Sequence, residues 1–193
     1  MRKFATIGTL GLLALNASAH GAPGDTELVS ERFDAPAPNI AGNGYSEIGS
    51  SANRAVSGNG RYVAFSSNAT DLVASDNNGR RDVFVYDRVS TTVEIVSVDS
   101  AGNQSNSDSY YPSISDDGRY VAFWSRATNL VTGDTNNRYD VFVHDRTVGT
   151  TERVSIDSAG TQGNFDSYYP SISADGRYVA FYSRATNLVT GDT

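Results

Sequence analysis

Two loops of the sequence carry oxygen-bearing side chains at a spacing that suits a cation. The set recurs after 58 residues, and its members are Asp76, Asn78 and Asp82, then Asp134, Asn136 and Asp140. Calcium-binding loops begin with such alternating Asp and Asn oxygens. The match is partial, because Arg80 and Arg138 occupy the position of the fifth ligand and the usual glycine is missing from the sixth. Calcium is therefore one interpretation, and Asx-turns that cap the loops through their own backbone are the other.

A second group of polar and aromatic side chains precedes two of the predicted strands. It consists of Asp108, Tyr110 and Tyr111, and of Asp166, Tyr168 and Tyr169. These residues end the segments 99–111 and 157–169, which we predict to be long loops at one end of the molecule. Long loops on a rigid scaffold are where binding usually takes place, so these residues form the predicted binding face. The alternative is that the tyrosines pack between neighbouring sheets with their hydroxyls reaching solvent.

No pattern in the sequence predicts a catalytic site. There are two histidines, His20 and His144, and no cysteine that could act as a thiol nucleophile. The sequence has no zinc-protease H-E-x-x-H, no G-x-S-x-G elbow, no phosphate-binding P-loop and no G-x-G-x-x-G. The acidic residues recur once per repeat, as scaffold residues do. The sequence therefore predicts that this chain is not an enzyme and needs no cofactor other than a calcium ion in the loops described above.

A tandem repeat with a period of 58 residues is the clearest feature of the chain. The hexapeptide GRYVAF at 60–65 returns at 118–123 and again at 176–181. Residues 113–135 and 171–193 differ at only two of 23 positions. Repeats of this length indicate an architecture in which one supersecondary unit is stacked against its copies.

Each repeat predicts four short antiparallel strands. In the second repeat they are expected at 112–115, 119–125, 140–146 and 151–156, and elsewhere at 61–67, 82–88, 93–98 and 177–183. Asp117 and Gly118 make the tight turn between the first two strands of the second repeat. Apolar residues lie on both faces of the next strand, as in strands sandwiched between neighbouring sheets. The predicted fold class is all-β, with four-stranded antiparallel meanders stacked as β-propeller blades.

The repeat resembles one that is already known. The pattern Ser-x-Asp-Gly-Arg-x-Val-Ala-Phe at 115–123 and 173–181, followed by Asp-Val-Phe-Val and Thr-Glu-Arg-Val-Ser, is similar to the TolB-type, WD-like β-propeller repeat of bacterial exported proteins. The pattern is looser at 57–65, where Asn59 replaces the aspartate. The resemblance covers about residues 54–193 and is specific for the repeat rather than for a function.

Two functions are compatible with this resemblance. The first is a non-catalytic module that binds a protein, a peptide or a cell-envelope component through its long-loop face. The second is an accessory propeller domain of a hydrolase or peptidase whose catalytic part is not in this chain. The formal charge of −7 argues against nucleic acid as a partner, because nucleic acid requires a positive patch.

The first nineteen residues have the three-part plan of a secretory signal peptide. A basic start at 1–3 is followed by an apolar run at 4–15, and Ala17 and Ala19 occupy the positions that signal peptidase reads. The run of about twelve residues is shorter than the roughly twenty that a membrane span requires. We therefore expect a periplasmic or secreted protein with no membrane span in its mature chain.

The number of repeats is small for a closed propeller, which usually has about four to eight blades. The expected parts are the signal peptide (1–19), an N-terminal segment (20–53), a first blade with its connection (54–111), a second (112–169) and half of a third (170–193). Residues 26–30 resemble the fourth strand at 151–155 and could complete a blade of a closed ring. We expect an incomplete open arc, as in a truncated protein, with two strands in the last sheet.

Overall fold

The computed structural model describes residues 42–48 and 54–192. All the described residues belong to one compact unit, 42–193. They form strands, turns and bends without a helix, as the repeat predicts. Within these ranges there is accordingly no helix with the length and apolar character of a membrane span. The predicted signal peptide and the predicted strand at 26–30 lie outside the described residues.

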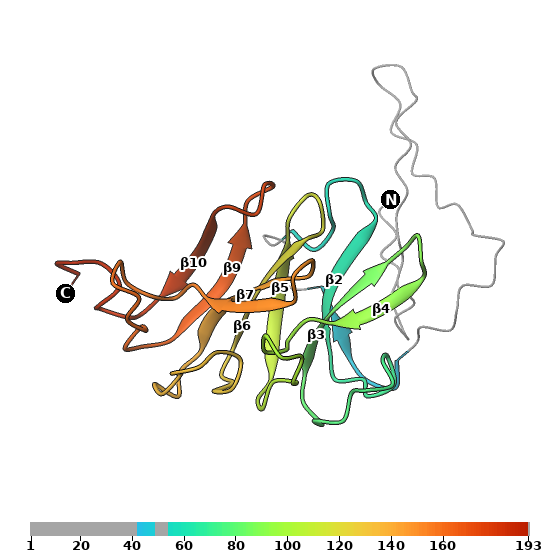
Figure 1. Cartoon of the computed structure of the whole chain (residues 1–193), viewed down its shortest axis with the longest axis horizontal. Helices are drawn as coiled ribbons and strands as arrows, with labels where there is room; N and C mark the ends of the chain where they lie inside the picture. Colours follow the sequence, from blue (N-terminus) through green and yellow to red (C-terminus); the bar gives the residue numbers. More distant parts are fainter. Residues whose placement is uncertain (1–41, 49–53, 193) are drawn as a thin grey trace, which may run out of the picture. The chain divides into compact units, whose positions relative to one another are not determined.

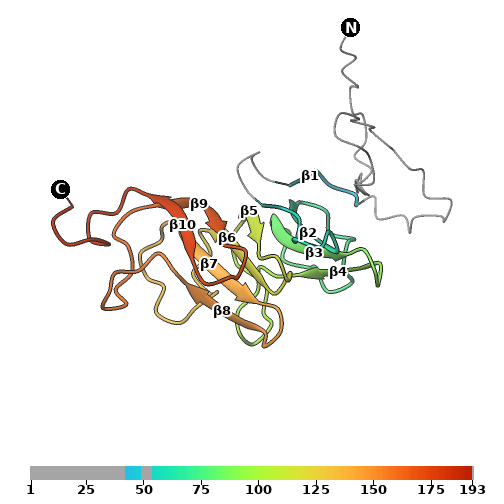
Figure 2. The same ribbon diagram turned by 90° about the horizontal axis from the view of Figure 1, so that it is seen from above.

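Three antiparallel sheets follow one another along the chain (Figure 1). Their orders are β1-β2-β3-β4, β5-β6-β7-β8 and β9-β10. The strands are β1 (Ser46–Glu47), β2 (Tyr62–Ser67), β3 (Asp82–Asp87), β4 (Thr92–Ile95), β5 (Ser109–Ile114), β6 (Tyr120–Ser125), β7 (Asp140–Asp145), β8 (Thr150–Arg153), β9 (Ser167–Ile172) and β10 (Val179–Ser183). Seen from above, the sheets lie side by side in sequence order (Figure 2). This is an open arc of propeller-type blades, and the last sheet has two strands, as expected.

The first and second sheets, here called the first and second blades, are built in the same register. Phe84 pairs with Ile95 across β3 and β4, and Phe142 pairs with Arg153 across β7 and β8. Residues 58 apart in the sequence therefore occupy equivalent places in the two blades, and side chains can be compared position by position.

The apolar core lies between the blades. It joins side chains from both of them, namely Ala64, Val83, Val85 and Val96 with Ile114, Val121, Phe123, Ala127, Leu130 and Phe142. All six residues of β3 are buried, and so are five of the six in β6. Both faces of these strands are covered, which confirms the prediction of sandwiched strands.

The glycine of the repeated hexapeptide lets one blade approach the next closely. Gly118 has a positive φ of 75°, and a Cβ atom placed there would lie 2.0 Å from the Tyr62 ring of the preceding blade. Gly176 has the same relation to Tyr120, at 2.2 Å. The glycine therefore serves both the hairpin turn and the packing of the tyrosine against its backbone.

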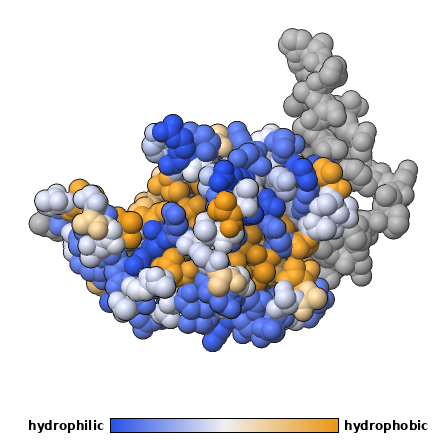
Figure 3. Space-filling view, viewed as in Figure 1, coloured by the Kyte–Doolittle hydropathy of each residue, from blue (hydrophilic) through white to orange (hydrophobic). Residues whose placement is uncertain are grey.

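The last sheet shows what the neighbouring blade contributes. β10 repeats most of the sequence of β6, yet its residues alternate between half-buried and exposed. Tyr182 is 54% exposed, whereas Trp124 at the equivalent place is 8% exposed. Figure 3 shows apolar residues at the surface in the region of β9 and β10. Burial of this strand is thus a property of the stack and not of the strand's own sequence.

The first strand of each blade starts earlier than expected. β5 begins at Ser109 instead of Pro112, and its pairing with β6 contains a bulge between Tyr110 and Ser113. The bulge interrupts the alternation that a sequence pattern relies on. In the first blade, β1 pairs with β2 although it lies before residue 54, where we expected the blade to begin.

Candidate functional site

Aromatic rings gather where β5 and β9 begin. The aromatic cluster consists of Tyr110, Tyr111, Trp124, Tyr139, Tyr168 and Tyr169. Trp124 lies at its centre, with Tyr110 stacked 4.5 Å away and Tyr168 edge-on at 5.1 Å. The second blade and the last sheet meet in this cluster, because the rings of Tyr111 in β5 and Tyr169 in β9 are 5.7 Å apart. Packing between aromatic rings of this kind makes a rigid surface.

Two tyrosines of the aromatic cluster have a backbone conformation that side chains rarely adopt. Tyr111 has a φ of 47° and Tyr169 a φ of 53°. Both lie in the bulge of the first strand of a blade, next to a proline. A bulky residue in this left-handed region costs about 1–3 kcal/mol, and such strain is concentrated at binding and catalytic sites. The repeat thus holds the same strained tyrosine in two consecutive blades.

The two aspartates of the predicted binding face anchor the loops. Oδ1 of Asp108 accepts the backbone N–H of Arg81 at 3.0 Å, and Oδ1 of Asp166 accepts that of Tyr139 at 3.0 Å. The other oxygen of Asp108 accepts the Tyr110 hydroxyl at 3.2 Å. Burial raises the pKa of Tyr110 to about 12, and the charge of Asp108 adds to this. Tyr110 is therefore a neutral hydrogen-bond donor at every physiological pH.

The residues of the predicted binding face do come together, but on strands and not in loops. Tyr110 and Tyr111 are in β5, Tyr168 and Tyr169 are in β9, and the aspartates come just before these strands. Three members of the assembly were missed from the sequence. They are Trp124, Tyr139 and Arg81, whose guanidinium lies over the Tyr110 ring at 5.4 Å. The substitution of tryptophan for the tyrosine of the next repeat was the available signal.

The Asp/Asn loops contain Asx-turns. The amide oxygen of Asn78 accepts the backbone N–H of Arg80 at 2.9 Å, and that of Asn136 accepts the N–H of Arg138 at 2.9 Å. The amide nitrogen of Asn136 donates to Oδ2 of Asp140 at 2.8 Å. The two asparagine oxygens are therefore committed to the loop backbone and do not converge with the aspartate oxygens.

The aspartates of these loops are buried, which is unusual for carboxylates. Asp82 and Asp140 are fully buried, and Asp76 and Asp134 are each 8% exposed. Burial raises the pKa of Asp82 to about 6, although the hydroxyl of Ser97 lowers it, and burial raises the pKa of Asp134 to about 6 as well. Among the described residues, no three Asp, Glu, His or Cys side chains are grouped so as to hold a metal ion. Any cation here would need oxygens of other kinds beside these carboxylates.

His144 has a structural environment. It is 6% exposed, its Nδ1 lies 2.9 Å from the hydroxyl of Thr151, and burial lowers its pKa. It pairs with Val121 and Thr151 inside the second blade. A neutral, buried and hydrogen-bonded imidazole of this kind packs in the sheet and faces no site.

Comparison with known proteins gives structural neighbours. No family model matches the sequence, and no curated protein matches it. The chain is similar to TolB from Acinetobacter baumannii, with 20% identity over 68% of this chain and 26% of that chain and a TM-score of 0.44. It is similar to the putative TolB from Agrobacterium tumefaciens, with 19% identity, coverage of 69% and 38%, and a TM-score of 0.44.

A third neighbour is hydrazine synthase from Kuenenia stuttgartiensis, with 20% identity, coverage of 65% and 35%, and a TM-score of 0.39. The chain spans less than two fifths of each of these three structures. Its own sheets make it an all-β repeat protein of propeller-type blades in an open arc.

Proposed function

We propose that this chain is an exported, non-catalytic propeller module that binds a protein, a peptide or another cell-envelope component through the aromatic cluster. The observation that carries this proposal is the pair of strained tyrosines, Tyr111 and Tyr169, held 5.7 Å apart in consecutive blades. This backbone strain destabilises the fold, and it is repeated in the second blade and the last sheet. Strain of this kind is concentrated at functional sites, which supports a role for the two tyrosine rings in binding.

The composition of the aromatic cluster suits recognition of a macromolecule. Tyrosine and tryptophan are enriched at interfaces, because they bring a large apolar area with little conformational entropy to lose. Tyr169 is 52% exposed and so available to a ligand, whereas Trp124 beneath it is buried and gives rigid support. Arg81, paired with Glu47 at 3.0 Å, adds a charged edge to the same surface. This mixture of an apolar centre and a polar rim is typical of protein-binding sites.

Site-specific photo-crosslinking tests the proposal. The full chain is produced in its native organism with a benzophenone amino acid in place of Tyr169. Irradiation should then give discrete adducts with one or a few cell-envelope components. Tyr178 is the matched control, because it is 65% exposed and belongs to the same repeat but lies outside the aromatic cluster. The Tyr111→Gly variant should lower the yield at position 169, since glycine accepts the positive φ but removes the ring. Absence of adducts at 169, or the same adducts at 169 and 178, would contradict this function.

Export is a separate part of the proposal and has its own measurement. Mass spectrometry of the mature protein should find a new N-terminus at His20, because signal peptidase is expected to cleave after Ala19, the last residue of the Ala-Ser-Ala sequence. An intact Met1 on a membrane-bound product would contradict it.

A further inference from the structure

The second blade contains a buried cation of its own, the guanidinium of Arg153, whose side chain is 10% exposed. Its Nη1 atom lies 2.9 Å from Oε1 of Gln162, 3.3 Å from Oδ1 of Asp134 and 3.9 Å from Oδ2 of Asp140. Three oxygens, two of them from buried carboxylates, thus surround one nitrogen. Arg153 compensates the charge of the two aspartates, which would otherwise be buried at a cost of several kcal/mol each.

The first blade keeps the oxygens and lacks the guanidinium. The equivalents of the three oxygen donors are Asp76, Asp82 and Gln104, and the equivalent of Arg153 is Ile95. Among the ion pairs of the described residues, none includes Asp76 or Asp82. Within the described part of the chain, the first blade therefore buries two carboxylates that form no ion pair with a positive side chain.

The carboxylate oxygens of the first blade are also short of hydrogen bonds. Neither oxygen of Asp76 accepts one from another described residue, and the same holds for Oδ2 of Asp82. Burial raises the pKa of Asp76, and the backbone N–H of Asn78 opposes this rise without reaching hydrogen-bond geometry. Oδ1 of Asp82 accepts the hydroxyls of Ser97 at 2.6 Å and Ser105 at 3.1 Å. Both oxygens of Asp76 are thus available to a ligand. Oδ2 of Asp82 has no hydrogen bond of normal geometry, although an interaction with the Asn78 side chain opposes the rise that burial causes in the pKa of Asp82.

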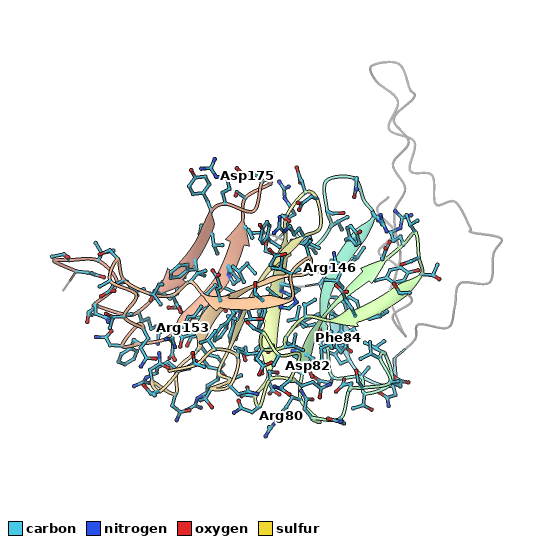
Figure 4. All side chains as sticks on the ribbon, in the orientation of Figure 1. Arg80, Asp82, Phe84, Arg146, Arg153 and Asp175 are labelled. Atoms are coloured by element: carbon cyan, nitrogen blue, oxygen red, sulfur yellow. The ribbon has the colours of Figure 1, made fainter. Side chains whose placement is uncertain are left out.

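The two arginines of the first loop do not supply the missing charge. Arg81 pairs with Glu47, and Arg80 is exposed and points away from the sheet, whereas Asp82 points into it (Figure 4). The first blade instead has one more oxygen than the second, because Ser105 occupies the place of Gly163. Both exchanges, Arg153 to Ile95 and Gly163 to Ser105, change a site that holds a guanidinium into one that offers oxygen ligands.

We propose that Asp76, Asp82 and Gln104 of the first blade bind a calcium ion at the position that Nη1 of Arg153 occupies in the second blade. Carboxylate and amide oxygens are hard donors of the kind that calcium prefers, and its six to eight ligands leave room for hydroxyl, carbonyl or water oxygens. The bonds of about 2.3–2.6 Å to calcium require the oxygens to move inwards relative to their spacing around Nη1. Oε1 of Gln104 also accepts the backbone N–H of Asn77 at 3.3 Å, and its second lone pair is the one offered to the ion. The asparagine oxygens, which are held in Asx-turns, are not ligands in this site.

Thermal unfolding of the full chain tests the site. Calcium at about 100 times its Kd should raise the Tm by roughly 5–10 °C over the value in chelator, since binding stabilises only the folded state. Sodium chloride at equal ionic strength should not reproduce the shift. Magnesium should raise the Tm less, because it loses its water reluctantly. Calorimetric titration with calcium should give one site per chain.

Three variants assign the effect to the first blade. Ile95→Arg supplies the guanidinium of the second blade and should abolish the calcium shift, while its Tm in chelator equals or exceeds that of the wild type. Asp76→Asn should also abolish the shift and keeps the side-chain shape, which matters if Ile95→Arg does not fold. Asp134→Asn is the matched control in the second blade and should leave the calcium shift of the first blade intact. No shift in the wild type, or an equal shift in Asp76→Asn, would overturn the proposal.

Discussion

The first and second blades have the same strands in the same register, but they treat the same buried acid pair differently. In the second blade Arg153 lies against Asp134 and Asp140, and in the first blade Ile95 stands in its place beside Asp76 and Asp82. The repeat therefore preserves the carboxylates and not their counter-charge. The difference teaches that a repeat can keep its geometry and its buried carboxylates while the side chain that neutralises them in one blade is replaced by an apolar one in the other.

The largest effect on the difference between the two blades is expected from substitution of Arg153. Arg153→Ile makes the second blade like the first and leaves two buried carboxylates unpaired, which should cost about 3–5 kcal/mol of unfolding free energy. The equivalent truncation in the first blade, Ile95→Val, should cost only about 0.5–1.5 kcal/mol. Urea unfolding of both variants in chelator measures the two losses. A loss below about 1 kcal/mol in Arg153→Ile would mean that the guanidinium does not compensate the aspartates.

Glycine substitutions in the repeated hairpin sharpen the comparison at the boundary of the blades. Gly60→Ala and Gly118→Ala share the strain of a positive φ, about 1–2 kcal/mol each. Only at Gly118 would the new Cβ meet the Tyr62 ring, at 2.0 Å, whereas at Gly60 the nearest atom is Nη1 of Arg88 at 3.7 Å. Gly118→Ala should therefore lose a further 1–3 kcal/mol or so from overpacking.

The measurement is the difference in urea midpoint between the two glycine variants. If the Tyr62 ring moves aside without cost, the two variants will have equal midpoints, and the close packing of blades on this glycine would be unimportant for stability.

The smallest effect is expected where the two blades agree. Arg61 pairs with Asp87 at 2.7 Å, and Arg119 pairs with Asp145 at 2.6 Å. Hydrogen bonding from the arginine lowers the pKa of each aspartate below its usual value. Each pair therefore contributes stability above the unfolded pKa of about 4, and this contribution is lost as the pH falls towards the lower folded pKa.

Arg61→Gln and Arg119→Gln should each lower the urea midpoint at neutral pH only slightly, because both guanidinium groups are more than a third exposed and are screened by solvent. The two losses should be equal and should shrink as the pH falls below the unfolded pKa of about 4. Urea unfolding at pH 7 and at pH 3 checks this. A large difference between the two variants would show that the blades differ here as well.

The strands, their order and the open arc could be predicted from the sequence because the same strand and turn pattern recurs, with its GRYVAF hexapeptide present three times. The start of β5 could not, because a bulge with a left-handed Tyr111 followed by Pro112 does not look like a strand. The binding-face tyrosines were identified from the sequence for their position, yet their assembly around Trp124 depends on contacts between strands far apart in the chain.

The sequence by itself determined the period, the all-β class and the absence of catalytic patterns, since these follow from local order and residue type. The sequence also shows that Ile95 in the first repeat corresponds to Arg153 in the second, but it does not show what either side chain contacts. Only the tertiary structure placed that side chain between two buried carboxylates, because β8 and the loop before β7 are brought together by sheet pairing and burial, which no local pattern encodes. The charge of a site is set by residues that are neighbours in space, and in this protein those neighbours include a guanidinium in the second blade and an isoleucine at the equivalent place in the first.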